Sequence, residues 1–178
     1  MKSLGCHKRI SIIVLTYNKS DMLIKCLASI QKTLPDRDAP ELLVVDNGSS
    51  DGTDTLVKQR FPWIRVVRIP KNIGYSRGMN IGIASSSPSS EYIVLLSNDL
   101  ELHGDWIGSL IAPALKDLSV GIVGCKLVYP SGRIQHAGGK MDQKFRPTHI
   151  GQGELDRGDF DSVREMPFVT AAVMPGFT

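Results

Sequence analysis

Short, mostly apolar runs recur along the first hundred residues, separated by segments whose apolar residues fall at helical spacing. Such runs indicate strands buried on both faces, because a half-exposed strand would alternate apolar and polar residues. The predicted strands cover 9–16, 41–45, 64–69 and 91–96, and the predicted helices begin near 20, 53 and 75. Strands that alternate with helices predict the α/β fold class, with a mostly parallel central sheet flanked by helices.

The first helices have recognisable starts and apolar faces. Ser20 or Asp21 is expected to cap the first helix, and Thr53 or Asp54 the second, because short oxygen-bearing side chains accept bonds from free N–H groups. The third helix is expected to pack closely on the sheet through four residues: Gly78, Met79, Gly82 and Ile83.

The pattern weakens after residue 100. A helix is expected within 103–118, starting near Asp105 and disturbed at Pro113, which lacks an N–H group. The remaining segments are expected to form a strand, a turn, a short strand, an irregular loop and a last strand, at 120–129, 130–133, 134–137, 138–165 and 167–174. The whole chain, 1–178, is expected to form one domain.

Composition narrows the classes of protein. The chain has 178 residues and 42% hydrophobic content, which are ordinary values for one globular domain. The net charge is +3 and the Lys and Arg residues are scattered, so no nucleic-acid partner is expected. Cys6, Cys26 and Cys125 show no CxxC spacing, which disfavours a disulfide framework or a zinc site and favours a reducing compartment.

Targeting signals are not evident. No stretch approaches the roughly 20 apolar residues that a membrane-spanning helix requires. The basic start (Lys2, Lys8 and Arg9) precedes an apolar run that is too short for a secretory signal. The expected location is cytoplasmic. Peripheral contact of this start with the cytoplasmic membrane face is an alternative to a solvated tail.

Polar residues gather where the predicted strands end. Ligands of open α/β sheets bind in the crevice beyond the carboxyl ends of the strands. Each of these residues also has a structural interpretation, as a turn former, a helix cap or a packing residue. The candidates, all at strand ends or just after one, are Thr16, Tyr17, Asn18, Asp46, Asn72, Gly74, Asn80, Ser97, Asn98 and Asp99.

The chemistry of this set suits a nucleotide. The first strand is not followed by a GxGxxG turn, which disfavours a dinucleotide site, and the glycines around Gly121 lack the spacing of a phosphate loop. Tyr17 offers an aromatic face, Asp46 can accept hydrogen bonds from a base or ribose, and Asp99 can hold a hard cation. Mg²⁺ needs only one or two protein carboxylates when phosphate oxygens complete its coordination.

Several motifs together resemble the family 2 glycosyltransferases of GT-A fold. The motifs are SIIVLTYN at 11–18, LVVDNGSSDGT at 43–53, NIG at 72–74, NIG at 80–82 and LLSND at 95–99. The later GCKLVYPSGRIQHAGG, at 124–139, is similar to the branch that contains rhamnosyltransferases and related enzymes of cell-surface polysaccharide synthesis.

The resemblance implies a function. It implies inverting transfer of a sugar from a nucleotide diphosphate sugar, of UDP or dTDP type, to a glycan or lipid-linked acceptor, with Mg²⁺ or Mn²⁺. Thr16, Tyr17 and Asp46 would contact the nucleoside, and the segment 72–80 would border the donor. On this basis 1–102 forms the donor-binding half and 103–178 a partial acceptor half.

The chain departs from the family at two places. Ser97 stands at the first acid of the DxD motif, so the metal ligand would be Asp99 alone. The strand at 167–174 is not followed by the family's acidic motif, so the catalytic base is unknown and the chain is expected to be C-terminally truncated. The acidic residues between 154 and 165 are explained by a solvated loop, and His136 by packing or by a surface position.

Two alternatives follow from that second departure. The first is a non-catalytic nucleotide-sugar-binding module that lacks the base, since an inverting displacement requires a base near the attacking hydroxyl. The other is a sheet domain without a ligand. A chain that ends at a strand is also expected to self-associate through the apolar surface left uncovered.

Overall fold

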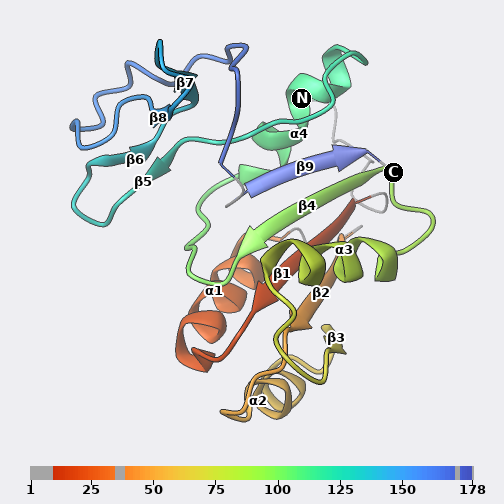
Figure 1. Cartoon of the computed structure of the whole chain (residues 1–178). Coiled ribbons are helices and arrows are strands. Elements are labelled where there is room, and N and C mark those ends of the chain that lie inside the picture. The colour runs from red at the N-terminus through yellow and green to blue at the C-terminus, as the bar shows by residue number, and fades with distance from the viewer. Residues whose placement is uncertain (1–9, 35–38, 171–172, 178) are drawn as a thin grey trace.

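A computed structural model describes residues 10–34, 39–170 and 173–177. Its centre is a five-stranded sheet in the order β3-β2-β1-β4-β9 (Figure 1). The first four strands in that order are parallel, and β9 runs antiparallel along β4. The strands are β1 (Ile10–Thr16), β2 (Glu41–Asp46), β3 (Arg65–Arg68), β4 (Tyr92–Ser97) and β9 (Val173–Phe177). The predicted α/β class with a mostly parallel sheet is confirmed.

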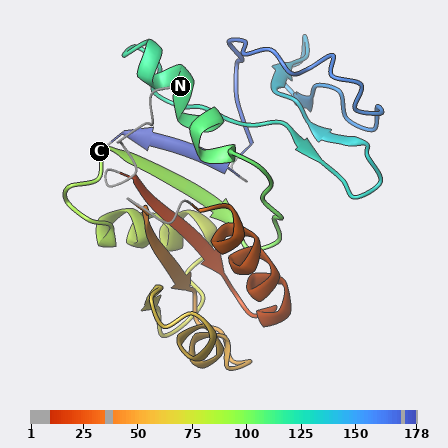
Figure 2. The same cartoon turned by 180° about the vertical axis from the view of Figure 1, so that it is seen from behind.

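Helices cover both faces of this sheet. Figures 1 and 2 show α3 on one face and α1 and α4 on the other. Every residue of β1 is buried, as its mostly apolar sequence predicts, and the polar Ser11 and Thr16 are buried with the rest. The helices are α1 (Ser20–Thr33), α2 (Thr53–Arg60), α3 (Tyr75–Ser85) and α4 (Trp106–Lys116).

The two faces of β1 serve two separate cores. Ile12 and Val14 pack with residues of α1, α2 and α4, including the fully buried Leu27. Ile13 and Leu15 point the other way, toward Met79 of α3 and its neighbours. Successive strand residues alternate between faces, so a strand between two helical layers must be apolar throughout.

Close packing of α3 depends on its glycines. A Cβ atom at Gly82 would lie 2.6 Å from Ile13 Cγ2 and 2.9 Å from Val45 Cγ2. Gly78 and Met79 are also buried, as the sequence predicts. Ile83 was expected to point inward but is 37% exposed, because the contact line of α3 runs through residues 78, 79 and 82.

The predicted helix caps were wrong. Ser20 and Thr53 are the first residues of α1 and α2, and neither helix has a side-chain bond from its N-cap residue. Asp51 serves both starts instead: its carboxylate accepts from the N–H groups of Ser20 and Thr53, each at 3.2 Å, and from the Thr53 hydroxyl. Although partial burial opposes the change, these bonds hold the pKa of Asp51 below its usual value.

The predicted cap of α4 is confirmed. Asp105 precedes the helix, and its carboxylate accepts from the Gly108 N–H at 3.0 Å. The expected disturbance at Pro113 is not found. Pro113 lies inside α4, and its carbonyl still accepts from the Asp117 N–H at 3.1 Å. The missing N–H therefore removes one bond near the helix end without ending the helix.

The strand predicted at 120–129 was wrong. Only β5 (Leu127–Val128) forms there, and it pairs with β6 (Ile134–His136) outside the central sheet. The reason is that β9 occupies the position beside β4. The last strand is also displaced from the predicted 167–174. Phe168 makes an isolated bridge with Gly139, and regular pairing begins at Val173.

The segment expected to be irregular, 138–165, contains a short hairpin of β7 (Gly139–Met141) and β8 (Pro147–His149). Lys126 anchors this segment through ion pairs with Asp156, at 2.7 Å, and Asp161. Figures 1 and 2 both show β5 to β8 at the periphery, far from α2 and β3. In the described part of the chain, no helix has the length and apolar content that a membrane crossing requires.

Two cysteine thiols are expected to be unreactive. Burial raises the pKa of Cys26 to about 12 and that of Cys125 to about 11. The thiolate is the reactive form, so only about one thiol in a thousand or fewer is ionised at pH 8. We expect both cysteines to resist iodoacetamide in the folded chain and to react in urea, as measured for each peptide by mass spectrometry. Rapid labelling of Cys26 in the folded chain would contradict this packing.

Candidate functional site

A cavity of about 360 Å³ opens at the carboxyl ends of β1 and β4. This is where an open α/β sheet binds its ligands. Six of the candidates proposed from the sequence line it, namely Thr16, Tyr17, Asn72, Ser97, Asn98 and Asp99, together with Leu15, Lys19, Asn47 and Tyr75.

The loop between β1 and α1 forms one wall of the cavity. The Asn98 side-chain N–H group donates to Thr16 Oγ1 at 2.9 Å, and the Thr16 hydroxyl donates to the Asn18 carbonyl at 3.1 Å. Asn18 and Lys19 then both adopt left-handed backbone conformations, with φ of 56° and 58°. Two consecutive residues other than glycine in this region are strained, and such strain is concentrated at functional sites.

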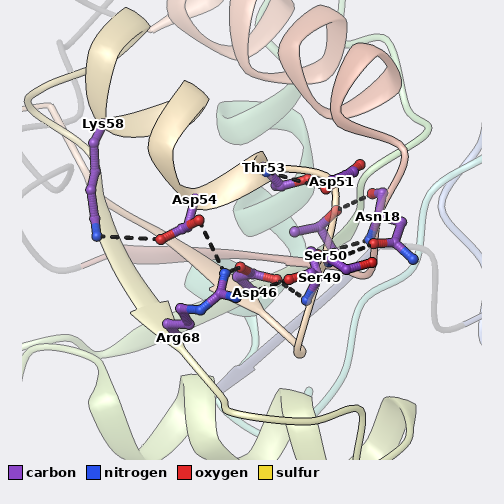
Figure 3. A network of polar contacts seen from close by, with 10 residues as sticks. Asn18, Asp46, Ser49, Ser50, Asp51, Thr53, Asp54, Lys58 and Arg68 are labelled. Carbon is purple, nitrogen blue, oxygen red and sulfur yellow. Dashed lines mark hydrogen bonds and ion pairs between the residues drawn. The ribbon is translucent and has the colours of Figure 1, made fainter.

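Asn18 does not line the cavity but fixes the wall in place. Its N–H donates to the Ser49 hydroxyl at 2.8 Å, and its side-chain oxygen accepts from the Ser50 N–H at 2.9 Å (Figure 3). The loops after β1 and β2 are therefore bonded directly to each other. These bonds fix the strained conformation that places Lys19 beside the cavity.

Asp46 is fully buried and is absent from the cavity lining. One of its oxygens accepts from the Ser49 N–H at 2.8 Å, and the other pairs with the Arg68 guanidinium. Arg68 also bonds the Ser49 carbonyl at 2.9 Å and Asp54 at 3.0 Å (Figure 3). In this arrangement Asp46 shapes the loop that follows it, and contact with a nucleoside would require these bonds to rearrange.

Asn47 reaches the cavity where Asp46 does not. Its amide donates to Asn72 Oδ1 and to the Gly74 carbonyl, both at 3.2 Å. Its oxygen accepts from the Ile73 N–H at 3.1 Å. Asn47 thus ties the end of β2 to the segment before α3. The sequence interpretation missed it, although its place directly after a buried strand was a usable signal.

Two further candidates lie outside the cavity lining. Gly74 is the N-cap of α3, with φ of 89°, and it holds the turn into that helix. Asn80 lies within α3 on an exposed position. The structure therefore gives Gly74 a role in shaping the loop and does not bring Asn80 to the cavity.

Tyr75 is a second aromatic residue at the cavity that the sequence interpretation missed. Its hydroxyl is hydrogen-bonded to Ser97, which links the start of α3 to the end of β4. Burial raises the pKa of Tyr75, and the negative charge of Asp99 adds to this rise. Tyr17 and Tyr75 are 48% and 44% exposed, so the cavity offers two aromatic rings to a ligand.

The charges at the cavity are few and of opposite sign. Among the described residues that line it, Lys19 and Asp99 carry formal charge at pH 7. The described residues contain no group of three or more His, Cys, Asp or Glu side chains that could hold a metal alone. Asp99 is exposed, so it fits a hard cation that arrives with a phosphate ligand supplying most of its oxygens.

His136 is a packed side chain. It is 1% exposed, and its Nδ1 lies 2.7 Å from Nδ1 of His149. Burial lowers the pKa of His136, and the neighbouring charge of His149 lowers it further. Neither histidine lines the cavity. The structural interpretation made from the sequence therefore agrees with its position.

The parallel sheet, its two helical layers and the solved structures that align with the chain define the fold class, the GT-A fold. The chain belongs to glycosyl transferase family 2, whose family model matches residues 11–167. The recognition made from the sequence motifs is confirmed by this match.

Two curated relatives indicate the branch. The chain is 30% identical over 133 residues to the O-antigen biosynthesis protein RfbC of Myxococcus xanthus, covering 73% of this chain and 10% of RfbC. It is 24% identical over 144 residues to N-acetylglucosaminyl-diphospho-decaprenol L-rhamnosyltransferase of Mycobacterium tuberculosis, covering 76% of this chain and 46% of that enzyme. The chain therefore spans less than half the length of either relative.

A solved structure gives the same fold. The mannosyltransferase PcManGT from Pyrobaculum calidifontis, in complex with GDP-Man and Mn²⁺, aligns with a TM-score of 0.58 and 25% identity. The alignment covers 69% of this chain and 36% of PcManGT. The sequence motifs predicted a rhamnosyltransferase-like branch related to polysaccharide synthesis. The names of the two curated relatives agree with that prediction.

Proposed function

We propose that this chain binds the donor of a glycosyltransferase that moves a sugar, with inversion, from a nucleotide diphosphate sugar to an acceptor hydroxyl. The proposed donor is of UDP or dTDP type. The proposed acceptor is a glycan or lipid-linked sugar of cell-surface polysaccharide synthesis. The observation that carries the proposal is the cavity at the carboxyl ends of β1 and β4, which places Lys19 and Asp99 beside two tyrosine rings.

Each lining residue has a proposed role. Tyr17 and Tyr75 offer ring faces to a planar base, as exposed aromatic residues commonly do. Lys19 offers an ammonium group to a phosphate, and its strained backbone fixes the start of that side chain. Asp99 would hold Mg²⁺ or Mn²⁺, which when bound would offset the charge on a departing diphosphate.

Asp46 and Asn47 act behind the lining in this proposal. Asp46 shapes the loop through Ser49 and Arg68, and Asn47 holds the segment 72–74 in place. Asp46 would contact a nucleotide base only after its ion pair with Arg68 had broken. The proposed primary role of Asp46 is therefore to position other residues.

Thermal unfolding with nucleotides tests the proposal. We expect one of UDP, dTDP and GDP, with Mn²⁺, to raise Tm by about 5–10 °C at a hundred times its Kd, which corresponds to roughly 2.7 kcal/mol. Asp99→Ala should lose most of this shift because the cation loses its protein carboxylate. Asp159→Ala is the matched control, since Asp159 lies in an exposed loop outside the cavity lining.

Each outcome has a distinct meaning. No Tm shift with any nucleotide would refute the donor site. If Asp99→Ala shows the same Tm shift as the parent chain, Asp99 is not the metal ligand, but the proposed nucleotide site still stands. Release of nucleotide from the matching nucleotide sugar in the presence of acceptor would support transfer, whereas binding without release would favour a nucleotide-sugar-binding module.

A further inference from the structure

The hairpin of β7 and β8 ends in a tightly bonded three-residue loop, Gln143 to Phe145. The Asp142 N–H donates to the Arg146 carbonyl at 3.0 Å, and the Phe145 N–H donates to the Asp142 carbonyl at 3.0 Å. The Asp142 carboxylate accepts from the N–H groups of Lys144 and Arg146 at 2.8 and 2.9 Å, and from the Arg146 guanidinium at 2.8 Å. The tip therefore has a defined conformation.

Phe145 is an unusual residue for its position. A three-residue hairpin loop of this kind ends in a left-handed residue, where glycine is favoured. Phe145 adopts that conformation with φ of 57°, and its side chain is 83% exposed. A phenylalanine here carries both a backbone cost and the cost of leaving an aromatic ring in water. Neither cost is offset by packing within the described residues.

Three cations lie close to Phe145 in the sequence. Lys140, Lys144 and Arg146 lie within the seven residues 140–146, and all three are exposed. The one acid in that stretch, Asp142, is engaged by the backbone of the loop and by Arg146, which hold its pKa below the usual value. Met141 beside it is 45% exposed, so the tip combines two apolar side chains with an excess of positive charge.

We propose that this hairpin tip, Lys140 to Arg146, docks on an anionic lipid bilayer. Phe145 and Met141 would enter the boundary between headgroups and acyl chains, while Lys140, Lys144 and Arg146 contact lipid phosphates. Aromatic side chains with adjacent Lys and Arg are the combination that binds such interfaces. The peripheral position of β7 and β8 leaves the tip accessible in the described structure (Figure 1). The proposal does not depend on the donor site.

Vesicle sedimentation tests the proposal with the 178-residue chain. We expect binding to vesicles of equal parts phosphatidylglycerol and phosphatidylcholine, little binding to phosphatidylcholine alone, and a loss of binding as salt is raised. Lys144→Gln should weaken binding about fivefold, since one cation near such a surface contributes roughly 1 kcal/mol. Phe145→Ser should weaken it by a similar factor. Val163→Ser is the matched control, because Val163 is 79% exposed but lies outside the tip.

A second variant separates binding from folding. Phe145→Gly suits the left-handed backbone, so it should keep or slightly raise Tm while losing vesicle binding to the same extent as Phe145→Ser. Three results would overturn the proposal: no binding of the parent chain to anionic vesicles, equal binding to neutral vesicles, or unchanged binding of Phe145→Gly. The nucleotide-induced Tm shift should be the same in the parent chain and Phe145→Gly, so failure here would not bear on the donor site.

Discussion

Gly48→Ala is expected to destabilise the fold by about 2–5 kcal/mol. Gly48 has φ of 83°, and a Cβ atom there would lie 2.5 Å from the Lys71 carbonyl carbon and 2.6 Å from the Asn72 nitrogen. The left-handed conformation costs alanine roughly 1–2 kcal/mol, and forced displacement of the facing backbone costs about 1–3 kcal/mol more. We expect Tm to fall by about 4–20 °C in a thermal unfolding experiment.

Gly52→Ala is the matched control for this change. Gly52 has nearly the same φ, 78°, but a Cβ atom there would meet nothing within 4 Å. It should therefore cost about 1–2 kcal/mol, the conformational term alone. Equal losses in the two variants would show that the close approach of Gly48 to Lys71 and Asn72 does not constrain the protein. Because that approach brings Asn47 to Asn72, Gly48→Ala should also lower nucleotide affinity.

Asp46→Ala is expected to cost about 2–4 kcal/mol. The change leaves the buried Ser49 N–H without its acceptor and removes the buried partner of Arg68. Loss of a buried charged acceptor is among the more destabilising single changes, because the remaining polar groups stay desolvated. Urea unfolding should show a lower midpoint with an unchanged slope.

Asp54→Ala provides the comparison for Asp46. Asp54 bonds the same Arg68 guanidinium at 3.0 Å, but its side chain is 19% exposed and it lies in the first turn of α2. Exposed ion pairs contribute about 1 kcal/mol or less, so Asp54→Ala should have a much smaller effect. If Asp54→Ala lowers the free energy of unfolding as much as Asp46→Ala does, burial of Asp46 does not determine how much it contributes to stability.

The central sheet could be predicted because its signal is local. The run Ile10 to Leu15, which is apolar except for Ser11, predicts a strand covered on both faces, and the structure confirms it. The segment Val120 to Leu127 is also largely apolar, although it contains Gly121, Gly124 and Lys126, and it does not join the central sheet. Its failure is a matter of competition, since β9, fifty residues further along the chain, occupies the place beside β4.

Part of the candidate site could be predicted because it also depends on the local signal of the strands. Strand ends located Thr16 and Asp99, whose place at the edge of the sheet follows from the strands themselves. The sequence could not distinguish Asp46 from Asn47, because both are buried and only the fold decides which of the two lines the cavity. It also assigned the caps of α1 and α2 to neighbouring residues, whereas Asp51 provides a bond to α1 from thirty residues away.

The hydrogen bonds that join the strand-end loops determine at which stage of folding the cavity forms. Asn18 meets Ser49 and Ser50 across about thirty residues of chain, and Thr16 meets Asn98 across eighty-two. Contacts this distant in sequence form only after the intervening chain has collapsed and paired. The cavity is therefore a property of the completed sheet. A nucleotide that needs the whole cavity can recognise only chains in which β4 is already in place, so it would act as a reporter of finished folding.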